Sequence, residues 1–129
     1  MDTPRDSSAE RVDMRFDNAL AFYGTLRPGE SNHWLIRDIA GEWVEGVIRG
    51  YVFEVTWSGY EGYPGFVPDP GGHRVPVSVL VSDDWGRHVA KIDEFEGPGY
   101  ERRPFPVFAV EGDEVVGEAA VYEFLTGRE

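Results

Sequence analysis

Residues 74–81, RVPVSVLV, place valines at every second position of an eight-residue run. Successive side chains of a β-strand point to opposite faces, so this alternation predicts a strand with one apolar face. Pro76 interrupts the run, and proline lacks the backbone N–H that a sheet hydrogen bond needs. We therefore expect a strand in which Pro76 lies at a sheet edge or a bulge.

Other segments of the chain have compositions that also predict strands. The apolar run at 18–26, NALAFYGTL, ends in a turn signal, and residues 43–57 are rich in aromatic and β-branched side chains with interspersed glycine. We expect the latter to form one bent strand or two short ones. A loop rich in Gly and Pro leaves room for a short strand at 65–67. Two final strands, joined by a turn, are expected at 104–111 and 115–124.

Two segments have helical patterns. Residues 82–96, SDDWGRHVAKIDEFE, begin with Ser82 as a candidate N-cap and carry two acids in the first turn, where they suit the helix dipole. A shorter helix at 32–40 is expected between a Ser31 cap and Gly41. Strands outnumber helices, so the pattern predicts a small α+β domain built on a barrel-like sheet.

The composition narrows the class of partner. The chain has 24 acidic residues against 12 Lys and Arg, a net charge of −12 that repels nucleic-acid phosphates and anionic lipid surfaces. We expect a small-molecule substrate, with no nucleic acid and no membrane as partner, and a monomer or homodimer. Cysteine is absent, which excludes disulfides and thiolate chemistry. The three histidines lack metal-ligand spacing, so no metal site is predicted.

The length of 129 residues suits one domain. Residues 1–17 carry charges of both signs and no apolar centre, so we expect a flexible lead-in rather than a signal peptide. Residues 18–126 are then a single domain. No apolar run approaches the roughly 20 residues of a membrane helix. Together with the absence of cysteine, this favours a cytoplasmic protein.

Three carboxylates lie close together near the end of the longer predicted helix. On a wheel that advances about 100° per residue, Glu94 falls opposite the apolar stripe, Asp93 falls on its flank, and Glu96 falls in its middle. The stripe consists of Trp85, Val89, Ile92 and Phe95.

A carboxylate on the apolar face of a helix is costly to ionise, and burial raises its pKa above the free value of about 4.3. A raised pKa is what a general acid or base near neutral pH requires, so Glu96 is the candidate catalytic group. The alternative is that the helix frays at Phe95, which Gly97 and Pro98 allow. Glu96 would then be an exposed residue without a special role.

The loop FYGTLRPGE at 22–30 is a second candidate site. Gly24 allows close backbone approach to a ligand, and the N–H groups of residues 24–27 could cradle a carboxylate. Arg27 could pair with an acidic ligand or remain a surface charge. The alternative is a strand followed by an ordinary turn.

These stretches together resemble the gamma-glutamylcyclotransferase-like family, also called AIG2-like. The resemblance runs through YGTLRPGESNH at 23–33, YPGFVPDPGG at 63–72 and IDEFEGPGYERR at 92–103. AAVYEF at 119–124 is similar to the family's last core strand. The resemblance covers most of the chain and implies a small mixed β-barrel with one or two flanking helices.

The resemblance also implies which residues act. It makes Glu96 the catalytic glutamate, with the strand-end loop holding the α-amino and α-carboxylate end of a γ-glutamyl substrate. Arg27 and Arg102 are further candidates for substrate binding. The implied substrate-binding residues are Tyr23, Gly24, Thr25, Leu26, Tyr100 and Tyr122.

The implied reaction cyclises a γ-glutamyl group to 5-oxoproline and releases its amine or amino acid, an intramolecular aminolysis of the acyltransferase or lyase type. No cofactor is implied. One alternative is a non-catalytic domain of the same fold that binds a small molecule or regulates. An esterase or amidase is disfavoured because no Gly-x-Ser-x-Gly element is present. The residues do not choose the leaving amine.

Overall fold

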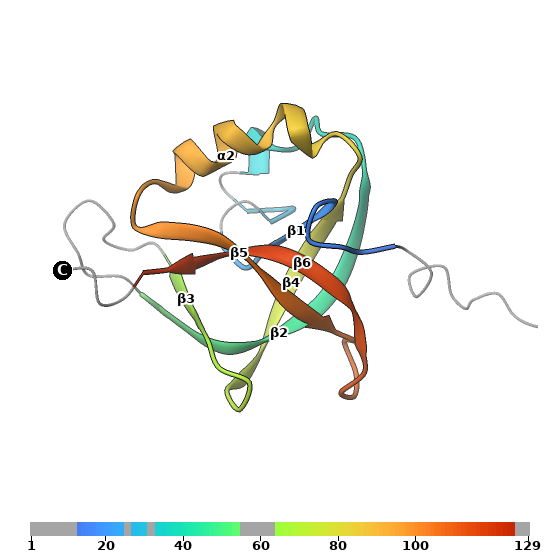
Figure 1. The fold of residues 1–129 in the computed structure, drawn as a ribbon, viewed down its shortest axis with the longest axis vertical. Coiled ribbons are helices and arrows are strands. Elements are labelled where there is room, and N and C mark those ends of the chain that lie inside the picture. Colours follow the sequence, from blue (N-terminus) through green and yellow to red (C-terminus); the bar gives the residue numbers. More distant parts are fainter. Residues whose placement is uncertain (1–12, 25–26, 31–32, 55–63, 126–129) are drawn as a thin grey trace, which may run out of the picture.

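The computed structural model describes residues 13–24, 27–30, 33–54 and 64–125. Six strands and one α-helix make up most of this part of the chain (Figure 1). Two short 3₁₀ turns, η2 at His33–Leu35 and η3 at Trp85–Arg87, accompany them. The strands are β1 Ala19–Phe22, β2 Glu42–Glu54, β3 Pro64–Pro68, β4 His73–Val81, β5 Tyr100–Phe108 and β6 Val115–Phe124, and the helix is α2 Val89–Glu96.

The sheet closes into a mixed barrel of five strands. Its order is β3-β2-β4-β1-β6-β5, and β2 pairs again with β5 through Val47 and Phe108, so that the ends of the sheet meet. β3 pairs with the far end of β2 as an added strand. β1 and β6 run parallel, whereas the other neighbours are antiparallel (Figure 1). The prediction of a small mixed β-barrel with a flanking helix is therefore confirmed.

β1 is buried on both faces, which explains its nearly continuous apolar sequence. Ala19 and Ala21 pack in the barrel interior, while Leu20 and Phe22 pack in a second core between the barrel wall and the helical segments. Parallel neighbours placed between two cores show this pattern instead of strict alternation. Because the two cores are built on shared strands, α2 is held directly against the wall of the barrel.

Pro76 lies in the part of β4 that has only one partner. It pairs with Val47 of β2, whereas β1 pairs only with residues 78–81 of β4. The proline therefore sits at a local edge, as expected. Residues 42–54 form one long strand, and the short strand expected at 65–67 is β3.

The helical predictions need correction. The segment 82–96 is divided at His88 into η3 and α2, and the hydroxyl of Ser82 accepts a hydrogen bond from the N–H of Asp84 (3.0 Å) without capping α2. The helix expected at 32–40 is a single 3₁₀ turn, η2, followed by hydrogen-bonded turns. Its predicted cap, Ser31, lies outside the described residues.

β5 begins earlier than predicted, at Tyr100 rather than Pro104, and ends at Phe108. The charged sequence of residues 101–103 concealed it, because these residues become strand only by pairing with β6. The family motif at 92–103 therefore runs from the end of α2 into the barrel wall, which its residues 100–103 join as the start of β5.

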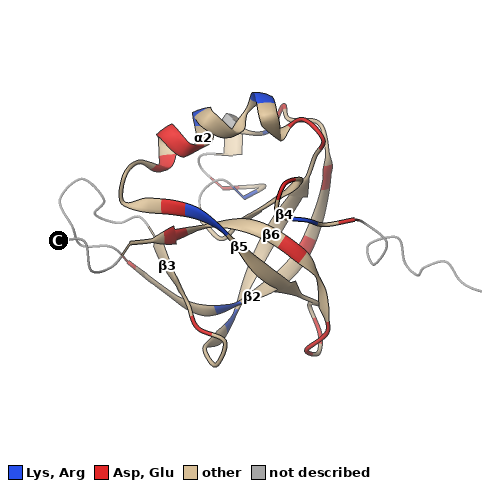
Figure 2. Cartoon of the chain, in the orientation of Figure 1, with Lys and Arg blue, Asp and Glu red and all other residues tan. Residues whose placement is uncertain are grey.

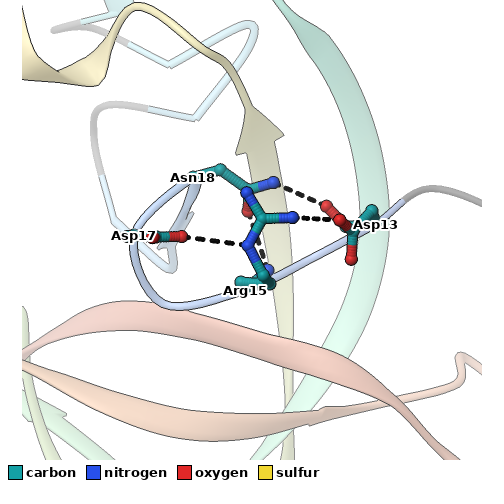
Figure 3. A network of polar contacts seen from close by, with 4 residues as sticks. All are labelled: Asp13, Arg15, Asp17 and Asn18. Atoms are coloured by element: carbon teal, nitrogen blue, oxygen red, sulfur yellow. Dashed lines mark hydrogen bonds and ion pairs between the residues drawn. The ribbon is translucent and has the colours of Figure 1, made fainter.

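The segment before β1 is packed against the barrel, although it falls within the predicted flexible lead-in. Met14 is buried in the interior core, and its carbonyl oxygen accepts a hydrogen bond from the N–H of Glu118 (3.1 Å). A network of polar contacts, drawn in Figure 3, ties the segment together at Asp13, Arg15, Asp17 and Asn18. Among the described residues, no helix has the length and apolar character to cross a membrane.

Candidate active site

The last turn of α2 places Glu96 at a defined helix end. The N–H of Gly97 donates to the carbonyl oxygen of Asp93 (3.0 Å), and Gly97 has a φ of 87°. That backbone conformation favours glycine, which makes Gly97 an effective helix terminator. The helix therefore persists through Glu96 and does not fray at Phe95.

The apolar face that the helical wheel predicted is only partly confirmed. Ile92 is fully buried, but Phe95 is 41% exposed. The wheel assumed one continuous α-helix from residue 82, and the break at His88 removes that assumption. Glu96 is half-buried and Glu94 is exposed, which agrees with the contrast that the wheel predicted between them.

Glu96 occupies an environment that disfavours its charge. Burial, together with the negative charge of Asp93, raises the pKa of Glu96 to about 7. Burial also raises the pKa of Tyr23, and the charge of Glu96 and the hydroxyl of Tyr100 raise it further. Glu96 lies at the end of α2, Tyr23 directly after β1 and Tyr100 at the start of β5, yet the three side chains share one electrostatic environment.

Three tyrosines surround this position, each with an anchored hydroxyl. The hydroxyl of Tyr23 donates to the carbonyl oxygen of Tyr122 (2.8 Å), and that of Tyr100 donates to the carbonyl oxygen of Pro64 (2.7 Å). The hydroxyl of Tyr122 donates to Oδ1 of Asp93 (2.5 Å). Rings held by such bonds form rigid walls for a small ligand.

Asp93 is the most heavily hydrogen-bonded acid of the group, which the sequence did not reveal. Arg102 binds both of its oxygens, with Nε to Oδ1 at 2.9 Å and Nη2 to Oδ2 at 3.0 Å. These bonds, with the one from Tyr122, lower the pKa of Asp93. On the wheel Asp93 was only a flanking acid, because its partners are nine and 29 residues away in sequence.

The strand-end loop is described in part. Gly24 follows Tyr23, and a side chain there would meet Cγ of Pro64 at 3.0 Å, so the backbone of Gly24 lies close to the proline ring. The N–H and Nε of Arg27 both donate to the carbonyl oxygen of Gly24 (3.2 Å each). Arg27 also lies 3.7 Å from Glu30, so both its N–H and its charge have partners within the turn. Thr25 and Leu26 lie outside the described residues.

A shallow pocket of ≈ 630 Å³ borders the end of α2. Acidic residues gather on the last turn of α2, and acidic and basic residues follow at the start of β5 (Figure 2). No group of His, Asp and Glu suited to a metal ion occurs in the described part of the chain. The pocket is lined by Asp93, Glu94, Gly97, Pro98, Tyr100, Glu101, Arg102 and Tyr122.

The fold and the site define a class of small mixed β-barrels that present a half-buried carboxylate at the end of one helix. The chain belongs to the family described as gamma-glutamyl cyclotransferase, AIG2-like, whose model matches residues 20–129. That match covers every strand from Leu20 onward together with α2 and the tyrosine-lined site.

Solved structures share this fold. An AIG2-like protein from Mus musculus is 25% identical, with a TM-score of 0.63 over 84% of this chain and 78% of that one. An uncharacterised protein from Pyrococcus horikoshii is 27% identical, with a TM-score of 0.58 over 83% and 77% of the two chains. A protein from Arabidopsis thaliana, 22% identical with a TM-score of 0.62 over 87% and 71%, shares the fold. Comparison with curated proteins finds no match.

Proposed function

We propose that this protein is a γ-glutamylcyclotransferase-type enzyme in which Glu96 is the general acid and base. The observation that carries the proposal is a half-buried carboxyl at the end of α2 whose pKa is raised to about 7. Such a group can both accept and release a proton near neutral pH, whereas an exposed glutamate is almost fully ionised there. Membership of the AIG2-like family supports the reaction class.

The substrate of this reaction contains its own nucleophile, the α-amino group of a γ-glutamyl amide. Glu96, as carboxylate, removes a proton from the ammonium form, and the free amine attacks the γ-carbonyl carbon. A new C–N bond closes the five-membered ring. The bond to the departing amine breaks as Glu96 returns the proton to that nitrogen, and Glu96 then relays the second proton that the ring nitrogen loses, so that the amine leaves in its ammonium form. The products are 5-oxoproline and an amine or amino acid, with no water or cofactor consumed.

Much of the rate gain in this scheme comes from holding the substrate in its cyclising conformation. The loop that begins at Tyr23 is proposed to bind the substrate's α-carboxylate through backbone N–H groups near Gly24 and Thr25. Tyr100 and Tyr122 line the pocket, and the hydroxyls of Tyr23, Tyr100 and Tyr122 are each anchored on an oxygen atom of another residue. The arrangement restricts the conformations open to a bound γ-glutamyl chain.

The first prediction concerns the proton carrier. Glu96→Gln keeps the shape of the side chain but cannot accept the proton, so 5-oxoproline release should fall by at least about a hundredfold. The assay uses a panel of γ-glutamyl amines and γ-glutamyl amino acids and also identifies the preferred leaving amine.

Glu111→Gln is the matched control, because it removes the same charge from an exposed position in the turn between β5 and β6, outside the pocket lining. It should retain the parental rate. Parental turnover by Glu96→Gln would contradict the mechanism. Binding of panel compounds without turnover by the parent protein would instead favour a non-catalytic binding domain.

A further inference from the structure

The feature from which the inference starts is the contact of Asp93 with two strands of the barrel. Arg102 of β5 grips both carboxylate oxygens, and Tyr122 of β6 adds a third hydrogen bond. Planar, two-bond pairing of an arginine with a carboxylate is geometrically specific as well as strong. Asp93 therefore ties the last turn of α2 to two strands of the barrel wall.

Asp93 and Glu96 are three positions apart on the same helix, so their side chains lie on neighbouring parts of one face. The carbonyl oxygen of Asp93 also accepts the N–H of Gly97, which terminates the helix directly after Glu96. Any displacement of Asp93 moves this final turn. The orientation of Glu96 consequently depends on the bonds that Asp93 makes.

We propose that Asp93, clamped by Arg102 and Tyr122, is a positioning residue that fixes Glu96 in the site and keeps a negative charge beside it. The proposal rests on the function proposed for Glu96. It gives Arg102 a role different from the substrate binding expected from the sequence, because its guanidinium is already bound to Asp93.

Asp93 and Arg102 have opposite effects on the ionisation of Glu96. Asp93 disfavours the ionised form of Glu96, while Arg102 neutralises part of the charge of Asp93. Loss of Asp93 should therefore make Glu96 more acidic, and loss of Arg102 should make it less acidic. Tyr23 and Tyr122 interact electrostatically with Glu96, and Tyr23 also with Tyr100 and Glu123. Glu94 and Glu101 are further charged residues that line the pocket.

The same clamp reaches the substrate loop through Tyr122. Its hydroxyl holds Asp93, and its backbone carbonyl holds the hydroxyl of Tyr23. One residue of β6 thus ties the end of α2 to the start of the strand-end loop. The distance between the proton carrier and the proposed carboxylate cradle depends on this connection.

The test measures the pKa of the Glu96 carboxyl directly, by ¹³C NMR titration of Glu-labelled protein, and needs no turnover. Asp93→Asn should lower that pKa by at least about 0.5, and Arg102→Met should raise it by at least about 0.5. Glu94→Gln removes a charge from an exposed position of the same helix and should change the pKa much less, because solvent screens that charge.

Shifts in opposite directions support the proposal, because a purely structural loss would move the pKa in one direction or not at all. Unchanged values, or shifts of the same sign in both variants, overturn it. Asp93→Asn is isosteric and decides the question alone if Arg102→Met does not fold.

Kinetics provide the second measurement. The limb of the kcat/KM pH profile that reports Glu96 should move with the NMR value, and Arg102→Met should lower kcat roughly ten- to hundredfold because Glu96 is misplaced. Turnover losses that fall on KM alone argue against positioning. If the parent protein turns over no γ-glutamyl compound, the proposed function fails, whereas the NMR titration still decides whether Asp93 controls Glu96.

Discussion

Two acids of one helix differ because their surroundings differ. Glu96 is half-buried, and burial raises its pKa, whereas hydrogen bonds from Arg102 and Tyr122 lower the pKa of Asp93. The same carboxyl chemistry thus yields a proton carrier at one position and a permanent anion three residues earlier. This separation of roles through environment is typical of acid–base sites.

At the scale of this residue, stability should depend on pH. The unfolded chain ionises Glu96 near its ordinary pKa of 4.5 and the folded chain near about 7, so the free energy of unfolding falls as pH rises between these values. Ionisation of Glu96 across this pH range lowers the free energy of unfolding by up to about 3 kcal/mol, because a difference of one pKa unit corresponds to about 1.4 kcal/mol.

Glu96→Gln removes this titration. Denaturant unfolding at pH 4.5 and pH 8 should therefore show a smaller decline for the variant than for the parent protein. Glu94→Gln should decline like the parent. Equal declines in all three proteins would show that the pKa of Glu96 is not raised by folding.

At the scale of the element, α2 is short and its end matters more than its length. Its eight residues bury one side chain fully, Ile92, so packing alone holds it weakly. The hydrogen bonds from Arg102 and Tyr122 to Asp93 and the termination of the helix at Gly97 stabilise its position further. Gly97, which has a positive φ, ends the helix directly after Glu96, so that Glu96 lies in its last turn.

Gly97→Ala should therefore destabilise the protein by about 1–2 kcal/mol, because a Cβ is strained at a φ of 87°. Gly86→Ala, within η3, is the control, because nothing lies within 4 Å of the added carbon. Thermal or denaturant unfolding compares the two. A Gly97 variant as stable as the control would mean that the helix end tolerates a side chain.

At the scale of the whole molecule, barrel closure brings the site together. β2 meets β5 near Gly46 and Phe108, and this contact completes a ring that carries Tyr23, Arg102 and Tyr122 on neighbouring segments. Gly46 permits the approach, since a Cβ there would lie 2.5 Å from Cγ1 of the fully buried Val107.

Gly46→Ala should consequently cost about 1–3 kcal/mol of unfolding free energy through overpacking. Gly71→Ala serves as the control, because its added carbon would only touch an Asp69 oxygen at 3.7 Å. The double variant Gly46→Ala/Val107→Ala should lose less than the sum of the single losses, because the clash is shared. Strict additivity would exclude a clash between these two side chains.

Several features were predictable because they depend on one element at a time. The valine alternation at 74–81 identified β4, and the contrast between Glu94 and Glu96 followed from helical spacing. The family resemblance identified the mixed barrel, and the family match agrees. Predictions from the local sequence pattern were wrong where contacts with other elements decide the secondary structure. The charged residues 101–103 are strand only through β6, and the helix breaks at His88 although its sequence period continues.

The amino-acid sequence by itself determined the strand-rich domain, the family, and Glu96 as the acid that is out of place on its helix. Only the tertiary structure showed that Asp93 is clamped by Arg102 and Tyr122 and that Tyr23 shares the environment of Glu96. The physical reason is that periodicity records which face of an element is apolar. Partners from other elements are set by strand register and barrel closure, which no single segment encodes.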